Sequence, residues 1–167
     1  MKSVMSHLFS QIPRANIQRS IFDRSSGFKT TFNSGYLVPI FCDEVLPGDT
    51  FNLRASLFAR LATPAVPFMD NLFLETFWFF VPNRLVWQNW QKFCGEQENP
   101  DDSTDYLIPT ITSPAGGFDV GSIYDYFGIP TGVADLEFNA LPLRAYNLIH
   151  LKAIRHQDLF EAKGEPM

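Results

Sequence analysis

The chain has 167 residues, of which 46% are hydrophobic and only 19% charged, with 17 phenylalanines and a formal net charge of −5. A soluble domain usually carries about a quarter charged residues, so this composition indicates extensive contact with other protein subunits. Two cysteines exclude a zinc signature or a disulfide scaffold, and the absence of about 18 uninterrupted apolar residues argues against membrane insertion.

The N-terminal residues lack the apolar stretch of a secretory signal, so we expect synthesis and retention in a cytoplasm until assembly. In that compartment Cys42 and Cys94 are expected to be reduced and buried. At this length the chain can hold one domain with a core.

Residues 1–34 predict an extended basic arm, because they show no sustained period and their basic residues outnumber a single acid. Two interpretations remain open. In the first, Arg14, Arg19, Arg24 and Lys29 neutralise phosphates of a single-stranded nucleic acid without sequence choice. In the second, which the modest basic density favours, the arm wraps a neighbouring subunit and is anchored by Phe22, Phe28 and Phe32.

The segment after the arm predicts antiparallel strands. Tyr36–Phe41 is expected to be a short strand, placed at a sheet edge or a bulge by Pro39, and Leu46–Asp49 is expected to be a turn. Thr50–Arg60 alternates apolar and polar residues, which is typical of a half-exposed strand.

Residues 70–93 are the most apolar block of the chain. Leu72–Val81 predicts an internal strand, with Trp78 and Phe79 buried on opposite faces. A helix is expected to follow, capped by Asn83 and ended by Gly95. The block contains no nucleophile, histidine or paired acids, so we interpret its aromatic residues as core or subunit-interface anchors: Trp78, Phe79, Trp87 and Trp90.

Residues 95–140 predict a long acidic surface insertion, since no basic residue occurs between Lys92 and Arg144. Within it we expect a short strand near Leu107–Thr112 and a helical turn at Ser122–Phe127. A final helix is predicted to begin near Pro142 and to run toward Arg155.

Residues that often carry chemistry do not form a complete site in this sequence. Asp101–Asp105 resembles the start of a calcium loop, but Tyr106 and Thr112 occupy positions that require glycine and glutamate. The histidines lack metal-ligand spacing, and no serine or cysteine lies in a nucleophile motif. We therefore expect no enzyme activity, no metal site and no cofactor.

The chain resembles the major capsid protein of microviruses, small icosahedral single-stranded-DNA phages, in their gokushovirus branch. The similarity runs from Met1 to about Ile149 and covers the N-terminal part of the longer family proteins. Among the blocks that carry it are Phe22-Asp23-Arg24-Ser25, Gly35-Tyr36-Leu37, Leu46-Pro47-Gly48-Asp49-Thr50-Phe51-Asn52-Leu53, Phe58-Ala59-Arg60-Leu61-Ala62-Thr63-Pro64, Met69-Asp70-Asn71-Leu72-Phe73-Leu74 and Leu141-Pro142-Leu143-Arg144-Ala145-Tyr146-Asn147.

The resemblance implies a mainly β fold, an antiparallel jelly-roll β-sandwich with inserted loops and short helices, incomplete in this chain. Residues 35–167 would form the N-terminal portion of that domain. The implied function is a structural subunit that self-assembles into an icosahedral shell enclosing single-stranded DNA. The implied partners are copies of the chain, other virion proteins, the packaged DNA and a host surface receptor, and the implied locations are the virion and, during assembly, the bacterial host cytoplasm.

Two other classes of protein fit the predicted strands less well. A cellular ligand- or carbohydrate-binding β-sandwich requires a concave site lined by convergent polar groups. An enzyme on a jelly roll, such as a cupin, requires clustered histidines and acids, which this sequence lacks.

Overall fold

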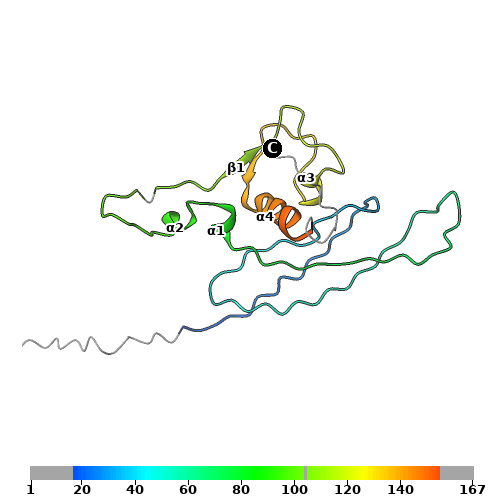
Figure 1. The fold of residues 1–167 in the computed structure, drawn as a ribbon, viewed down its shortest axis with the longest axis horizontal. Helices are drawn as coiled ribbons and strands as arrows, with labels where there is room; N and C mark the ends of the chain where they lie inside the picture. Colours follow the sequence, from blue (N-terminus) through cyan, green and yellow to red (C-terminus); the bar gives the residue numbers. More distant parts are fainter. Residues whose placement is uncertain (1–16, 104, 155–167) are drawn as a thin grey trace, which may run out of the picture.

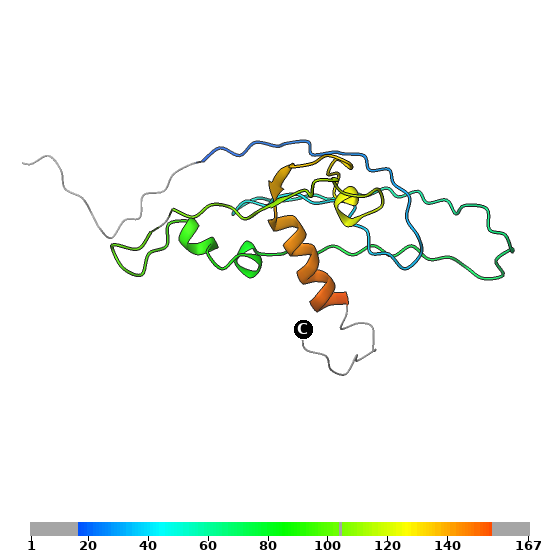
Figure 2. The same ribbon diagram turned by 90° about the horizontal axis from the view of Figure 1, so that it is seen from above.

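The structure, a computed structural model, describes residues 17–103 and 105–154. Residues 17–81 run as long extended segments, whereas residues 82–154, which we call the helical part, contain the helices and one two-stranded sheet (Figures 1 and 2). In chain order the elements are α1 (Asn83–Val86), α2 (Trp90–Phe93), β1 (Thr110–Thr112), α3 (Ile123–Tyr126), β2 (Glu137–Asn139), α4 (Leu141–Ile149) and the π-helical turn η1 (His150–Ile154).

Helix α4 begins where the sequence predicts it. Pro142 lies in its first turn, where a missing N–H costs nothing, and the Asn139 side chain accepts a hydrogen bond from the Leu141 N–H at 2.8 Å. Ala140, Leu141 and Leu143 are buried. The helix continues into η1 as far as the description reaches, and Arg155 lies outside the described residues.

Strands β1 and β2 pair antiparallel, with Ile111 opposite Phe138. β1 lies within the predicted strand Leu107–Thr112, whereas β2 lies where no strand was predicted. Beside this pair, the buried Ser113 hydroxyl donates to the Val133 carbonyl and accepts from the Leu136 N–H, both at 2.8 Å. Because the hydroxyl is fully hydrogen-bonded, its burial does not destabilise the fold.

Helix α3 confirms the predicted helical turn. The Ser122 side chain caps it by accepting from the Asp125 N–H, and Gly128 follows its end with a φ of +82°. Next to it, the Phe118 and Tyr124 rings stack with centroids 3.8 Å apart, and Phe138 meets both edge-on. The acidic insertion therefore has a small aromatic core of its own.

Gly117 lies where two loops of this insertion cross. Its φ is +71°, and a Cβ added to it would lie 2.4 Å from the carbonyl carbon of Gly132. The crossing is also closed by a hydrogen bond from the Gly132 N–H to the Phe118 carbonyl at 3.0 Å. Only glycine allows the two backbones to approach so closely.

Gly117→Ala is therefore expected to open this crossing. The left-handed backbone alone costs about 1–2 kcal/mol for an L-residue, and the steric overlap adds to it. Hydrogen exchange of the Gly132 amide should accelerate by at least about tenfold, which corresponds to about 1.4 kcal/mol. Gly116→Ala is the matched control, because nothing lies within 4 Å of the added Cβ. Equal exchange in both variants would contradict the prediction.

The predicted continuous helix from Asn83 to Gly95 is wrong. The chain leaves helical geometry at Trp87, whose φ is −145° and ψ 113°, so α1 and α2 are separate. The break buries the Trp87 ring against those of Trp90 and Phe93, at centroid distances of 6.1 and 5.1 Å. The predicted end is confirmed, since Gly95 has a φ of +98°.

The strands predicted at Tyr36–Phe41, Thr50–Arg60 and Leu72–Val81 are also wrong as paired strands. These segments are extended, but among the described residues the only backbone–backbone hydrogen bonds between residues 17 and 81 close turns, from Tyr36 to Asn33 and from Asp49 to Leu46. A strand requires a neighbour in register, and the extended segments do not supply one to each other.

The predicted burial of Trp78 and Phe79 is wrong for the same reason, because both remain 46% exposed. The centroid of the Trp78 ring lies 6.1 Å from that of Phe41, and the Phe79 ring stacks beside that of Phe77. Cys42 and Cys94 are free, as expected, but exposed instead of buried, since the extended segment and the end of α2 lie at the surface.

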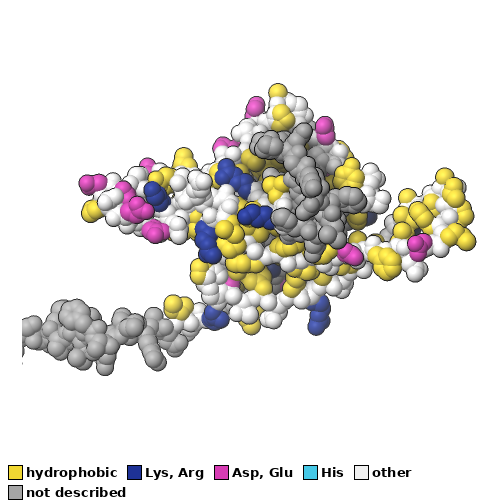
Figure 3. All heavy atoms as spheres, in the orientation of Figure 1, with side chains coloured by type: hydrophobic (Ala, Val, Ile, Leu, Met, Phe, Trp, Pro, Cys, Tyr) yellow, Lys and Arg dark blue, Asp and Glu magenta, His cyan; other side chains and the backbone are white. Residues whose placement is uncertain are grey.

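Many other apolar side chains of the extended segments are exposed. Phe58 is 93% and Met69 98% exposed, and hydrophobic side chains cover the projection at the right of Figure 3. No helix in the described part of the chain is long and apolar enough to cross a membrane.

Side chains of the helical part hold the extended segments by their backbone carbonyls. The Tyr146 hydroxyl on α4 donates to the Leu37 carbonyl at 2.9 Å, and the Tyr126 hydroxyl on α3 donates to the Thr31 carbonyl at 3.2 Å. Within the helical part itself, Arg144 on α4 donates to the Val86 carbonyl at the end of α1 at 3.3 Å. Burial raises the pKa of the Tyr146 phenol, so it remains a donor at neutral pH.

Candidate functional site

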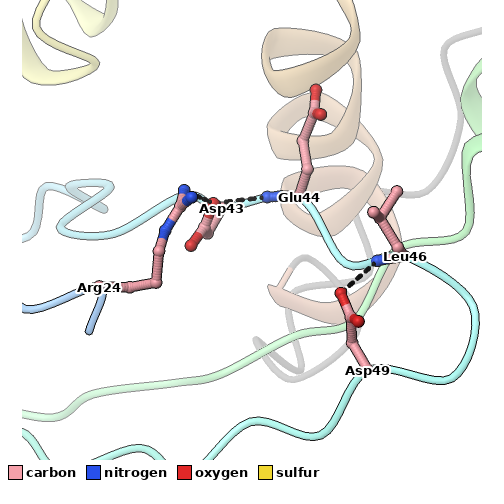
Figure 4. Close-up of polar contacts among 5 residues, drawn as sticks. All are labelled: Arg24, Asp43, Glu44, Leu46 and Asp49. Carbon is pink, nitrogen blue, oxygen red and sulfur yellow. Dashed lines mark hydrogen bonds and ion pairs between the residues drawn. The ribbon is translucent and has the colours of Figure 1, made fainter. Parts of the chain in front are cut away.

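The described part of the arm lies against the segment that follows it, and two of its arginines make the contact. Arg19 donates to the Gly48 carbonyl, and Arg24 pairs with Asp43 at 2.5 Å (Figure 4). The Asp43 side chain is only 11% exposed, whereas that of Arg24 is 65% exposed. These two contacts, together with the hydrogen bond from the Tyr126 hydroxyl to the Thr31 carbonyl, fix the arm to its own chain.

The turn that receives Arg19 is formed by local hydrogen bonds. The Asp49 side chain accepts from the Leu46 N–H at 3.1 Å, and the Asp49 N–H returns to the Leu46 carbonyl at 3.1 Å. Gly48 supplies the positive φ of +87° that this turn requires. The predicted turn at Leu46–Asp49 is therefore confirmed, and its geometry exposes the Gly48 carbonyl to Arg19.

The single acid of the arm is engaged locally. The Ser25 hydroxyl and the Ser25 N–H donate to the Asp23 carboxylate at 2.5 and 2.9 Å, and these bonds lower the pKa of Asp23, the hydroxyl more strongly. Asp23 thus bonds to Ser25, whereas Arg24 between them pairs with Asp43 on the following segment.

A cleft of about 440 Å³ lies between the arm and the following segment, lined by residues 23–28 and 40–43. Cys42 lies in its wall. The residue as a whole is exposed, but the cleft partly buries its thiol, and this desolvation, with a smaller effect of the carboxylates of Asp43 and Glu44, raises the pKa of the thiol. The thiol is therefore neutral at physiological pH and a weak nucleophile. No group of three or more potential metal ligands occurs among residues 17–103 and 105–154.

The structure does not bring all the predicted site residues together. Arg14 lies outside the described residues, Arg19 and Arg24 contact their own chain, and Lys29 is exposed. The rings of Phe22, Phe28 and Phe32 are also exposed. Trp87 and Trp90 pack together in the helical part, apart from the exposed Trp78 and Phe79.

Sequence reasoning missed Asp43 and Gly48 as the partners of the arm. Asp43 and Glu44 are the first acids after Asp23, which was the available signal for a pairing with the arm. Nothing local, however, distinguishes a pairing across 19 residues from a solvated carboxylate.

Asp43→Asn is expected to loosen the arm by removing the charge that holds Arg24. A partly exposed ion pair contributes up to about 1 kcal/mol, so tryptic cleavage after Arg24 should accelerate by up to about fivefold in limited proteolysis. Glu44→Gln is the control, because Arg24 is not bonded to it. Similar acceleration in both variants would assign the effect to net charge.

The fold and the arm together define a class of protein. Among the described residues, the extended segments form no backbone ladder with one another, and many of their aromatic side chains are exposed. The arm lies along the segment that follows it. These features are typical of a structural polypeptide whose surface is largely covered by other subunits. Comparison with known proteins agrees: a family model described as "Capsid protein (F protein)" matches residues 10–163, so the chain belongs to this phage capsid protein family. The predicted resemblance is confirmed, and the match extends beyond Ile149.

Three curated relatives each bear the name capsid protein VP1. The chain is 61% identical over 153 residues to that of Bdellovibrio phage phiMH2K, which covers 92% of this chain and 29% of the relative. It is 51% identical over 168 residues to that of Chlamydia phage 1, and this match covers 97% of this chain and 28% of the relative. It is 34% identical over 154 residues to that of Spiroplasma virus 4, and this match covers 92% of this chain and 28% of the relative. The chain thus spans less than a third of the length of these relatives.

Proposed function

We propose that this chain is a structural capsid subunit that assembles with copies of itself into an icosahedral shell around single-stranded DNA. The observation that carries the proposal is the extended course of residues 17–81, in which, among the described residues, the segments form no backbone ladder with one another and many aromatic side chains are exposed. Such groups are stabilised when another polypeptide covers them. Family membership supports the same function.

In this proposal residues 35–167 contribute extended segments to an antiparallel jelly roll that neighbouring polypeptide completes, with residues 95–140 as a surface insertion. The small β1–β2 pair is compatible with such a β-rich fold. The insertion would present the surface that meets a host receptor, and other faces would meet further virion proteins. Assembly would take place in the bacterial host cytoplasm and leave the chain in the virion.

For the basic arm, residues 1–34, we propose that it mainly wraps a neighbouring subunit as a strap, and that contact with DNA is the second candidate function. This order rests on Arg19 and Arg24, which already bind a carbonyl and a carboxylate of their own chain. The candidates for phosphate contact are Arg14 and Lys29, and also Arg19 and Arg24 if their contacts with Gly48 and Asp43 break. Phe22, Phe28 and Phe32 would anchor the strap in a neighbouring copy.

Particle formation tests the assembly proposal: the chain, or the longer protein that contains it, should give closed shells in negative-stain electron microscopy after expression. Absence of particles under all assembly conditions would contradict it. The DNA contact is tested separately, since affinity for an oligothymidine should fall with salt at a log–log slope of about −0.7 per phosphate neutralised. Replacing the four candidate basic residues by alanine should flatten that slope. An unchanged slope would leave the arm only the strap function.

A further inference from the structure

Charge is strongly segregated along the helical part of this chain. Residues 76–95 and 138–154 contain no acid, whereas residues 96–137 contain no base. In a chain with a net charge of −5, a surface free of acids is unusual and calls for an explanation.

The acid-free segments form one surface, which we call the basic face and define by Arg84, Arg144 and Lys152. Helices α1 and α4 pack against each other, and the hydrogen bond from Arg144 to the Val86 carbonyl joins them. Arg144 and Lys152 lie about two helical turns apart on one side of α4 and η1. All three residues are exposed. Lys and Arg side chains gather over this region in Figure 3.

The opposite charge gathers on the acidic projection, which we define as residues 96–103 and 105. It extends away from the body beyond α2, and Asp and Glu side chains surround it (Figures 1 and 3). Its loop is held by Asp102, whose carboxylate accepts from the N–H groups of Asn99 and Glu98 at 3.0 and 3.1 Å. These bonds, the one from Asn99 most strongly, and the charge of Lys92 lower the pKa of Asp102, so this carboxylate stays ionised at neutral pH.

The two charged surfaces do not satisfy each other within one copy. The ion pair between Arg24 and Asp43 is the only one among the described residues, and it involves neither surface. Among residues 17–103 and 105–154, the charges of both surfaces therefore have no ion-pair partner in their own copy.

We propose that the acidic projection of one copy docks on the basic face of a second copy. The two surfaces differ, so the contact is heterologous and repeats from copy to copy, which is the kind of contact that builds rings and shells. Charge complementarity selects the second copy as the occupant, because the same chain carries both the acid-only and the base-only surface. The inference rests on the proposed capsid function and names one of its subunit contacts.

Zero-length carbodiimide coupling tests the contact directly, because it joins a lysine amine only to a carboxylate that touches it. A mixture of unlabelled and ¹⁵N-labelled full chain should give mixed-isotope peptides that join Lys152 to Asp101 or Asp105. Their yield should fall by about fivefold or more between 0.05 and 0.5 M salt, as screening predicts. The proposal is overturned if these peptides carry one isotope only, or if Lys29 couples to the projection as well as Lys152 does.

Charge reversal provides an independent test in the same chain. Arg84→Glu with Lys152→Glu keeps the structural Arg144, and Glu96→Lys with Asp101→Lys keeps the structural Asp102. Each double variant should lose self-association in analytical ultracentrifugation, and an equimolar mixture should regain it. As the control, Arg54→Glu with Arg60→Glu, equally exposed but outside the basic face, should not rescue the projection variant.

The outcomes separate this contact from the capsid function itself. If wild-type chain forms shells and both double variants do so equally well, the contact is wrong and the capsid function stands. If wild-type chain forms no particle, the capsid function fails. If oligothymidine abolishes the Lys152 coupling and the basic-face variant no longer binds it, a nucleic acid is the occupant and the proposal is overturned.

Discussion

Trp87→Ala is expected to lower the free energy of unfolding of the helical part by about 3–5 kcal/mol, the usual cost of deleting a large buried aromatic side chain. Trp87 is only 7% exposed and contacts both Trp90 and Phe93. It lies between α1 and α2, so its loss leaves a cavity beside the rings of α2. Urea denaturation followed by far-ultraviolet circular dichroism measures the change.

Trp78→Ala is the matched control for this substitution. The same ring is removed, but 46% of Trp78 is already exposed, so no more than about half the loss is expected in the free chain. Equal losses in the two variants would mean that the extended segments bury their aromatic residues in solution, and the interface interpretation would then fail.

The free chain is expected to self-associate and to bind hydrophobic dyes. Its extended segments expose Phe58, Phe73 and Met69 beside backbone groups without partners, which is a template for pairing with further copies. Gel filtration with light scattering should give masses well above 19.0 kDa, accompanied by bright dye fluorescence.

Phe58→Gln combined with Phe73→Gln should reduce both the dye signal and the mass by a clear margin, because the two rings are among the most exposed of the chain. Ala59→Gln changes a neighbouring residue without removing an aromatic ring and serves as the control. A dye-silent monomer near 19.0 kDa that unfolds cooperatively would show that residues 17–81 close a core of their own.

Local sequence signals predict the helical part well and the extended part poorly. Ser122 and Pro142 indicate helix starts by their own hydrogen-bonding chemistry, and Gly95 indicates a helix end, so all three positions were predictable. The same holds for the extended conformation of Leu72–Val81, because β-branched and aromatic residues favour it. Its pairing and burial depend on neighbours that the sequence pattern does not reveal.

The candidate site shows the same division. The basic and aromatic composition of the arm is visible in the sequence, but its partners Asp43 and Gly48 follow only from the folded backbone. The break at Trp87 likewise results from packing, since an ideal helix from Asn83 would keep that ring away from Phe93. Short strands such as β2 carry too few residues for a period to be recognised.

The way in which the two parts of the chain are joined has an evolutionary consequence. Tyr126 and Tyr146 donate to the carbonyl groups of Thr31 and Leu37, and every residue type supplies a carbonyl. Substitutions at these two acceptor positions therefore leave the attachment chemically intact, whereas the two donors are constrained. A phage lineage can thus diversify its extended segments, and with them its contacts to changing partners, without redesigning the joint that holds them.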